Sequence, residues 1–204
     1  MGKLLTIGMA THDDFDGVYF SIQSLRLHHK LNSDVELIVI DTNPNSNHSK
    51  PIQDLKGWIP NLKYISINKS GTSSRDEIFK NANGKYTICM DCHVIFPSGA
   101  IDSLLKYYED NPDCKNIVQG PMLYDNIKSY ATHFKPIWNQ HMYGVWDTDA
   151  RSCQKGEPFE IPMMGLGVFS CETKNWLGFN KLFRGFGGEE GYIHEKFRRA
   201  GGKA

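Results

Sequence analysis

The stretch CMDCH, residues 89–93, concentrates side chains that can bind metals or carry redox chemistry. Its Cys-x-x-Cys-His spacing is the attachment signature of a c-type haem, and two cysteines this close could also bind zinc or form a redox disulfide. Asp91 and His93 offer a fourth possibility. An oxygen and an imidazole at this spacing suit a divalent ion such as Mn²⁺, which keeps open positions for phosphate oxygens.

The surroundings of this stretch disfavour the first three interpretations. Cys89 and Cys92 close an apolar run that reads as a strand, where side chains three apart point to opposite faces, whereas a redox pair normally opens a helix. A structural zinc would need a second close pair of ligands, which the other cysteines do not form. A haem would need a second axial ligand and, in most settings, export. In an extended segment Asp91 and His93 would share one side. The simplest alternative is an aspartate that starts a turn beside a partly buried histidine.

A second candidate site is RGFGGEE, residues 184–190. Its glycines permit a close approach of the backbone. Glu189 and Glu190 fall in the first turn of a predicted helix, where the helix dipole favours the ionised carboxylate. An acidic first turn behind a flexible loop is the alternative that carries no function.

Composition narrows the classes of protein that can hold these sites. The 204 residues suit one domain, and Lys plus Arg equals Asp plus Glu at 23 each, so no global field selects nucleic acid or an anionic membrane. Five cysteines at irregular spacing indicate reduced thiols. The sequence shows neither a secretory signal nor an apolar run of transmembrane length. We therefore expect a cytoplasmic protein.

Apolar runs alternate with helical patterns through the first half of the chain. This alternation predicts parallel βαβ units and an open α/β sheet, with ligand sites at the carboxyl ends of its strands. The second half is less regular, with a Trp- and polar-rich segment at 138–153. The expected strands are 4–10, 35–40, 62–67, 86–90, 116–124 and 160–170, and the expected helices are 16–29, 73–82, 99–111 and 188–201.

The order of these motifs resembles a GT-A glycosyltransferase, most closely glycosyltransferase family 2, over nearly the whole chain. LLTIGMATHDD resembles that family's first strand and nucleotide-binding loop, VELIVIDTNP its second strand, and residues 73–105 its long central block. GFNKLFRGFGGEEGYIHEKFRRAG resembles its acceptor-side block. Ala10 stands where proline is usual and Thr42 where a second acid is common. The metal motif is Asp-x-His instead of Asp-x-Asp, a variant resembling the polypeptide N-acetylgalactosaminyltransferases.

The resemblance implies an α/β fold of the GT-A type, a Rossmann-like open mixed sheet flanked by helices. It implies one domain over 1–204, with a nucleotide-sugar-binding half at 1–98 and an acceptor-binding half at 99–204. The implied activity is metal-dependent transfer of a sugar from a nucleotide-diphosphate donor, most commonly a UDP-sugar. The acceptor would be a hydroxyl group of a saccharide, a lipid-linked molecule or a protein, and the cofactor would be Mn²⁺ or Mg²⁺.

The same resemblance assigns roles to individual residues. Asp91 and His93 would hold the metal, and Glu190 would take the place of the catalytic aspartate, acting as base in an inverting transfer with Glu189 orienting the acceptor or the base. The residues expected to bind the donor nucleotide are Thr11, Asp13, Asp41, Arg75 and Asp91.

Several points stay open at this level. Similar chains usually continue past RRAGG with another strand and often a histidine, so we expect either a shortened chain or a third metal ligand from elsewhere. His194, on the same helix face as Glu190, is a candidate ligand, with an ion pair to Glu190 as the alternative.

Trp138, Trp146 and Trp176 could form a floor for sugar rings or simply belong to the core. A sugar nucleotidyltransferase would need a Gly-x-Arg signature that is missing. A non-catalytic carbohydrate- or nucleotide-binding module on the same fold remains an alternative.

Overall fold

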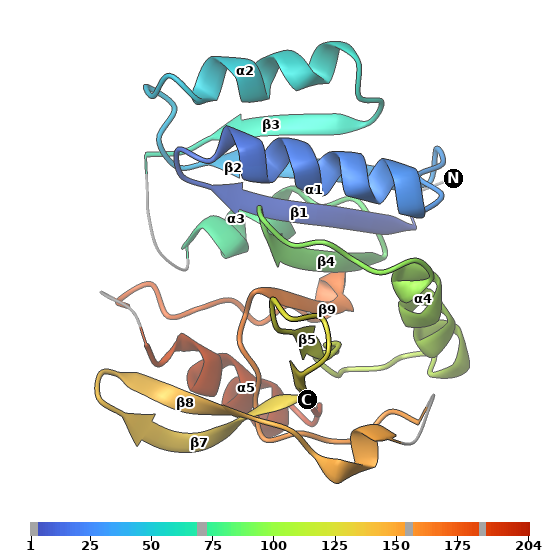
Figure 1. Ribbon diagram of the computed structural model, residues 1–204, viewed down its shortest axis with the longest axis vertical. Helices are drawn as coiled ribbons and strands as arrows, with labels where there is room; N and C mark the ends of the chain where they lie inside the picture. The colour runs from blue at the N-terminus through green and yellow to red at the C-terminus, as the bar shows by residue number, and fades with distance from the viewer. Residues whose placement is uncertain (1–3, 69–72, 154–156, 184–186) are drawn as a thin grey trace.

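A mixed sheet forms the centre of the molecule (Figure 1). The computed structural model describes residues 4–68, 73–153, 157–183 and 187–204. Within these residues the sheet has five strands in the order β3-β2-β1-β4-β9, of which β1 to β4 are parallel and β9 runs antiparallel to β4. The expected open mixed α/β sheet is therefore confirmed. Its strands are β1 (Leu5–Thr11), β2 (Val35–Asp41), β3 (Leu62–Ser66), β4 (Tyr86–Asp91) and β9 (Val168–Glu172).

The register of the parallel strands brings three of the predicted site residues together at the carboxyl ends of the strands. Thr11 at the end of β1 lies opposite Asp41 at the end of β2. On the other side of β1, Ala10 lies opposite Asp91 at the end of β4. Carboxyl ends of parallel strands are where ligands bind in open α/β sheets. The strands alone, without the loops, thus bring together the residues expected to bind the nucleotide and the metal.

Helices cover both faces of the sheet. Figure 1 shows α1 in front of β1 and α3 behind it. One apolar cluster joins α1, α2 and α4 to the front face, and a second joins α3 and α5 to the back face. The helices are α1 (Phe15–His28), α2 (Ser49–Asp54), α3 (Ser73–Asn81), α4 (Ala100–Asp110) and α5 (Glu189–Arg199), with 3-10 turns η1 (Leu55–Gly57), η2 (Ala150–Cys153) and η3 (Thr173–Asn175).

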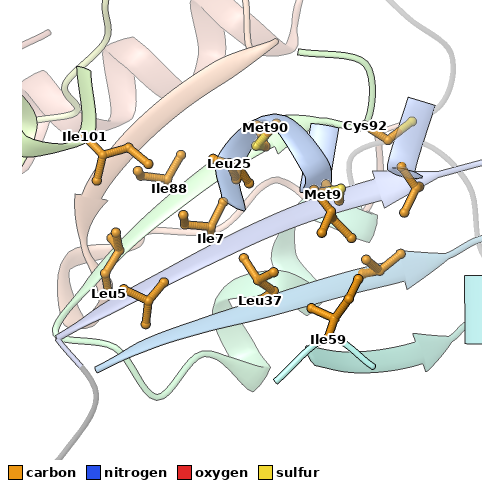
Figure 2. Close-up of a cluster of buried hydrophobic side chains, with 14 of the residues drawn as sticks. Leu5, Ile7, Met9, Leu25, Leu37, Ile59, Ile88, Met90, Cys92 and Ile101 are labelled. Atoms are coloured by element: carbon orange, nitrogen blue, oxygen red, sulfur yellow. The ribbon is translucent and has the colours of Figure 1, made fainter. Parts of the chain in front are cut away.

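The front cluster shows why the first half folds as its sequence predicts. Leu25 lies on the buried stripe of α1, and Ile7 and Met9 project from β1 into the same cluster (Figure 2). All three side chains are at most 1% exposed. Burying one such side chain contributes roughly 1.5–3 kcal/mol relative to leaving it exposed. This layer fixes the direction in which β1 ends, and therefore the position of the loop that follows it.

The second half departs from the expected elements. The segments 116–124 and 160–170, expected as strands, contribute only short pieces of strand, because most of their backbone lies outside the sheet ladders. The Trp-rich segment falls largely in a hairpin that was not foreseen, and the polar loop after β2 runs into α2. The remaining strands are β5 (Met122–Leu123), β6 (Tyr130–Ala131), β7 (His133–Asn139) and β8 (Met142–Asp147). In the described part of the chain no helix is both long enough and apolar enough for a bilayer crossing.

Candidate active site

The loop after β1 begins the site. Thr11 is buried, and its hydroxyl donates to the backbone oxygen of Asp14 at 3.3 Å. Asp13 has the left-handed φ of 57°, and its exposed carboxylate accepts hydrogen bonds of 3.1 and 3.0 Å from the Asn43 amide. Hydrogen bonds from Ser46 and Asn43 hold the pKa of Asp13 below its usual value. The Asp13 carboxylate is therefore an exposed, ionised group at the sheet edge.

Asp41 is placed at the same edge but is less available. It is buried, and its two carboxylate oxygens accept hydrogen bonds from the Asn43 backbone N–H at 2.9 Å and the Tyr64 hydroxyl at 2.6 Å. These partners make Asp41 a support for the 41–43 turn, which carries the Asn43 amide to Asp13. Apart from their polarity, nothing in the sequence pointed to Tyr64 or Asn43.

Arg75 and Asp91 form the central ion pair of the site. Arg75 Nη2 lies 3.2 Å from Asp91 Oδ1, and the Asp91 side chain is 39% exposed. Helix α3 brings Arg75 here because it packs directly on β1. A Cβ at Gly8 would lie 2.1 Å from Ile78 Cγ2 on α3, so only glycine permits this approach. The packing of α3 on β1 thus brings Arg75 to Asp91, a contact that the sequence alone does not predict.

His93 does not share one side of an extended segment with Asp91, as expected, because β4 ends at Asp91 and a turn follows. The turn brings His93 Nδ1 to 3.5 Å from Asp14 Oδ2, with the His93 side chain 66% exposed. Ser21 on α1 donates to the backbone oxygen of Cys92 at 2.8 Å and holds this turn against the helix. The roles of Asp91 and His93 as metal ligands stay predictions.

The thiols of the motif are not free thiolates. Burial raises the pKa of both Cys89 and Cys92 to about 12. Both are unbridged, as are the other three cysteines. A redox Cys-x-x-Cys needs a lowered thiol pKa, so the redox interpretation of this stretch finds no support.

The loop before α5 is fixed by its glycines and by Glu189. One Glu189 carboxylate oxygen accepts from the backbone N–H groups of Gly187 and Gly188 at 2.8 and 3.0 Å. Gly187 has φ of 113°, and a Cβ there would lie 2.4 Å from the backbone oxygen of His141 in the β7–β8 turn. Glu189 therefore orients the loop. The remainder of the predicted motif, residues 184–186, lies outside the described residues.

Glu190 is the most strongly perturbed carboxyl group of the site. It is 5% exposed, and its Oε2 atom has no hydrogen-bond partner among the described residues. Its pKa is raised to about 7, chiefly by burial; a backbone hydrogen bond and the Arg75 charge lower it, while the charges of Glu189 and Asp91 raise it. A backbone hydrogen bond at the start of α5 favours the ionised form of Glu190, but desolvation outweighs it.

His194 is neither paired with the Glu190 carboxylate nor free to bind a metal. Its Nδ1 lies 2.6 Å from the backbone oxygen of Glu190, and its Nε2 lies 3.3 Å from Gln119 Oε1. Complete burial lowers its pKa to about 4. His194 is therefore a neutral residue whose Nδ1–H donates to the Glu190 backbone oxygen within α5.

The three candidate tryptophans differ sharply. Trp176 stacks on Phe79 at 4.1 Å between ring centroids, so it belongs to the core behind the sheet. Trp146 packs edge-on against Phe134. Trp138 is 67% exposed on β7 and is the one of the three whose ring faces solvent.

A cavity of about 730 Å³ lies between the β7–β8 hairpin and α5. It is lined by Tyr143 and Tyr192 and by charges of both signs, Glu195 and Arg198 among them. A Cβ at Gly191 would lie 2.7 Å from the Tyr143 ring, so glycine is needed for the helix to pack here. Glu190 and Asp91 are not part of its lining, although Gly191, the residue after Glu190, is.

The donor atoms of Asp91 and His93 are of the types that a hard divalent cation binds. Asp91 offers a partly exposed carboxylate and His93 an exposed imidazole, an oxygen and nitrogen donor set that suits Mn²⁺ or Mg²⁺ with water or phosphate completing the coordination. A Cβ at Gly167 would lie 3.5 Å from Asp91 Oδ2, so glycine keeps the space beside this oxygen clear.

Comparison with known proteins identifies the family. A comparison with curated proteins found no match. Among solved structures, GalNAc-T7 with UDP, GalNAc and Mn²⁺ superposes with a TM-score of 0.78 at 18% identity, covering 99% of this chain and 42% of that one. The mannosyltransferase PcManGT from Pyrobaculum calidifontis, in complex with GDP-Man and Mn²⁺, gives 0.66 at 12% identity, covering 98% and 53%.

The chain thus spans about half the length, or less, of these two proteins, and the likeness confirms the GT-A fold. The sequence itself matches the model of Glycosyl transferase family 2 over residues 6–171, from the first strand of the sheet to its last. With this match, the chain belongs to glycosyl transferase family 2.

Proposed function

We propose that this chain catalyses metal-dependent transfer of a sugar from a nucleotide-diphosphate donor, a UDP-sugar first, to a hydroxyl group of an acceptor, with inversion and with Glu190 as the base. One observation carries this proposal. Glu190 combines a buried carboxyl group, an oxygen without a partner in the described structure and a pKa of about 7. A general base is most efficient when its pKa lies near the working pH.

The donor side rests on Asp13, Arg75 and Asp91. The exposed Asp13 carboxylate at the end of β1 can accept hydrogen bonds from a nucleoside, and the Arg75 guanidinium beside Asp91 can donate to a diphosphate oxygen. Asp91 and His93 would hold Mn²⁺ or Mg²⁺. When bound, such an ion supplies positive charge that stabilises the leaving diphosphate. The two solved relatives contain UDP and GDP-mannose, and of these we take UDP as the first donor to test.

The acceptor side rests on the loop before α5. Glu190 would take the proton as the O–H bond of the acceptor breaks and its oxygen bonds to the sugar. Glu189 spends one oxygen on the Gly187 and Gly188 N–H groups, so it would set the direction from which Glu190 faces the acceptor. The acceptor itself would lie in the half contributed by residues 99–204.

The test is thermal unfolding with EDTA, with Mn²⁺, and with Mn²⁺ plus UDP, GDP or dTDP, on wild type, Asp91→Asn and the exposed control Asp125→Asn. A nucleotide at about 100 times its dissociation constant should add about 2.7 kcal/mol, or roughly 5 to 10 °C. We expect a shift that needs both metal and one nucleotide, that is lost in Asp91→Asn and that persists in Asp125→Asn.

A transfer assay with the corresponding nucleotide-sugar then tests catalysis. No shift with any nucleotide would overturn the donor site and favour a carbohydrate-binding module on a transferase fold. A shift without transfer to any hydroxyl acceptor would overturn the catalytic part of the proposal alone.

A further inference from the structure

Three side chains beside the end of β4 bring one metal-ligating atom each into a small triangle. Cys92 Sγ lies 3.3 Å from Asp14 Oδ2 and 3.9 Å from His93 Nδ1, and Asp14 Oδ2 lies 3.5 Å from His93 Nδ1. Among the described residues these three form the one group of His, Cys, Asp and Glu side chains with the spacing of a metal site. The Asp91 carboxylate does not belong to it.

The triangle has the size of one face of a zinc tetrahedron. Zinc bonds of about 2.3 Å to sulfur and about 2.0 to 2.2 Å to nitrogen and oxygen, at tetrahedral angles, separate the ligand atoms by about 3.3 to 3.7 Å. The three measured edges lie at or close to this range. The spacing of the three ligand atoms is therefore compatible with binding one zinc ion.

The surroundings already orient these ligands. Asp14 caps α1 by accepting the Gly17 N–H at 2.7 Å with Oδ1, which leaves Oδ2 directed at Cys92 and His93. A Cβ at Gly17 would lie 2.3 Å from Oδ2, so glycine leaves room for this oxygen. Ser21 holds the Cys92 backbone oxygen. Hydrogen bonds that fix ligands in this way are typical of metal sites.

We propose that Asp14, Cys92 and His93 form a zinc site, separate in composition from the Asp91 and His93 pair and sharing one histidine with it. A thiolate ligand selects a borderline-soft ion such as Zn²⁺ over Mn²⁺ or Mg²⁺. His93 is exposed, so the fourth position opens to solvent and takes a water molecule. On binding, the sulfur bonds to the ion as the Cys92 S–H bond breaks, and its proton passes to the solvent.

Cobalt(II) and zinc titrations of the nucleotide-free protein test the site. Cobalt(II) reports a sulfur ligand through a thiolate charge-transfer band, and competition with a chromophoric chelator measures zinc affinity. We expect one equivalent of either ion in wild type, loss of the band and at least about 100-fold weaker zinc binding in Cys92→Ser, and no change in Cys153→Ser, because changes that only disturb ligand orientation already cost about 10- to 100-fold. Cys153 is an exposed thiol that does not belong to this group.

Asp14→Asn gives a second reading, because asparagine keeps the helix cap and removes the anionic ligand. We expect its zinc affinity to fall at least about 10-fold, and this comparison decides if Cys92→Ser does not fold. No thiolate band in wild type, a band that survives Cys92→Ser, or unchanged zinc affinity in Asp14→Asn would overturn the proposal. None of these measurements involves a nucleotide or a sugar, so their outcome does not depend on whether the proposed transfer occurs.

Discussion

The guanidinium group of Arg75 on α3 donates to the carboxylate of Asp91 at the end of β4 across 3.2 Å. Both side chains are partly exposed, so the pair is worth no more than about 1 kcal/mol of stability. Both charges also act on Glu190, whose pKa Arg75 lowers and Asp91 raises. The pair therefore connects the donor end of the site to the candidate base.

Arg75→Met should shift the pH dependence of transfer. Removing the positive charge raises the pKa of Glu190, so the limb where activity rises with pH should move to higher pH. The free energy of unfolding should fall by no more than about 1 kcal/mol. The measurement is kcat/KM against pH, with Lys80→Met, an exposed cation on the same helix, as control. A limb that stays in place or moves to lower pH would show that Arg75 does not act on the base.

Glu190→Gln should abolish transfer and stabilise the protein above neutral pH. A lost general base costs about 10²- to 10⁴-fold in rate, whereas the nucleotide-dependent thermal shift should remain. The folded pKa of about 7 exceeds the ordinary 4.5, so wild type loses stability as pH rises from about 4.5 to 7, by roughly 3 kcal/mol. Glutamine carries no such penalty.

Urea unfolding at pH 5 and pH 8 checks this, with Glu109→Gln as the exposed control. Equal stabilisation of the Glu190→Gln protein at both pH values would contradict the raised pKa. Equal loss of transfer and of nucleotide binding would contradict the assignment of Glu190 as base.

His194 should show the opposite pH dependence on the same helix. Its folded pKa of about 4 lies below the ordinary 6.5, so wild type loses stability as pH falls from about 6.5 to 4. Between about pH 4.5 and 6.5 the slopes of Glu190 and His194 therefore cancel, each being roughly 1.4 kcal/mol per pH unit.

His194→Asn should uncover the Glu190 slope, so that its stability falls with rising pH in this window, and Glu190→Gln should uncover the rising slope of His194. Unfolding free energies from urea titrations at half-unit steps separate these slopes from any constant loss of packing. Parallel curves for the two variants would rule out the opposed titration.

Gly187→Ala should impair the loop that sets Glu190. The added methyl group would meet the backbone oxygen of His141 at 2.4 Å, in a backbone conformation with φ of 113° that L-residues rarely adopt. We expect a loss of about 1 to 3 kcal/mol in stability and a larger fall in transfer than in nucleotide affinity. Gly57→Ala is the matched control, because a Cβ there meets nothing within 4 Å. If both substitutions behave alike, the close approach to His141 does not position the loop.

The sequence predicted those helices and strands in which burial of one or two faces produces a regular repeat of apolar residues. Strands β1 to β4 and helices α1, α3, α4 and α5 match the expected segments within a few residues. The strands form the central sheet and the helices pack on it, so burial determines the apolar pattern of each. The β7–β8 hairpin was missed because its exposed strands give no clear apolar alternation, and Pro136 and Gly144 read as loop.

The positions of the expected site residues were easier to predict than their environment. Asp41 and Asp91 lie at strand ends, since parallel strands end at one edge, and Asp13 lies in the loop after β1. The partners of His93 and the burial of Glu190 depend on tertiary packing, which spacing along the chain does not encode. Asp14 was overlooked for this reason, although an aspartate before an apolar helix is a typical N-cap.

Zinc and the manganese–nucleotide pair should compete, because both proposed sites use His93. One equivalent of Zn²⁺ added before Mn²⁺ and the nucleotide should remove most of the nucleotide-dependent thermal shift of wild type. In Cys92→Ser the same zinc addition should leave the shift intact, since this variant keeps Asp91 and His93 and loses only the sulfur ligand. Cys153→Ser should behave like wild type. Additive shifts from zinc and from manganese with nucleotide would show that the two sites do not share His93, even if each ion binds alone.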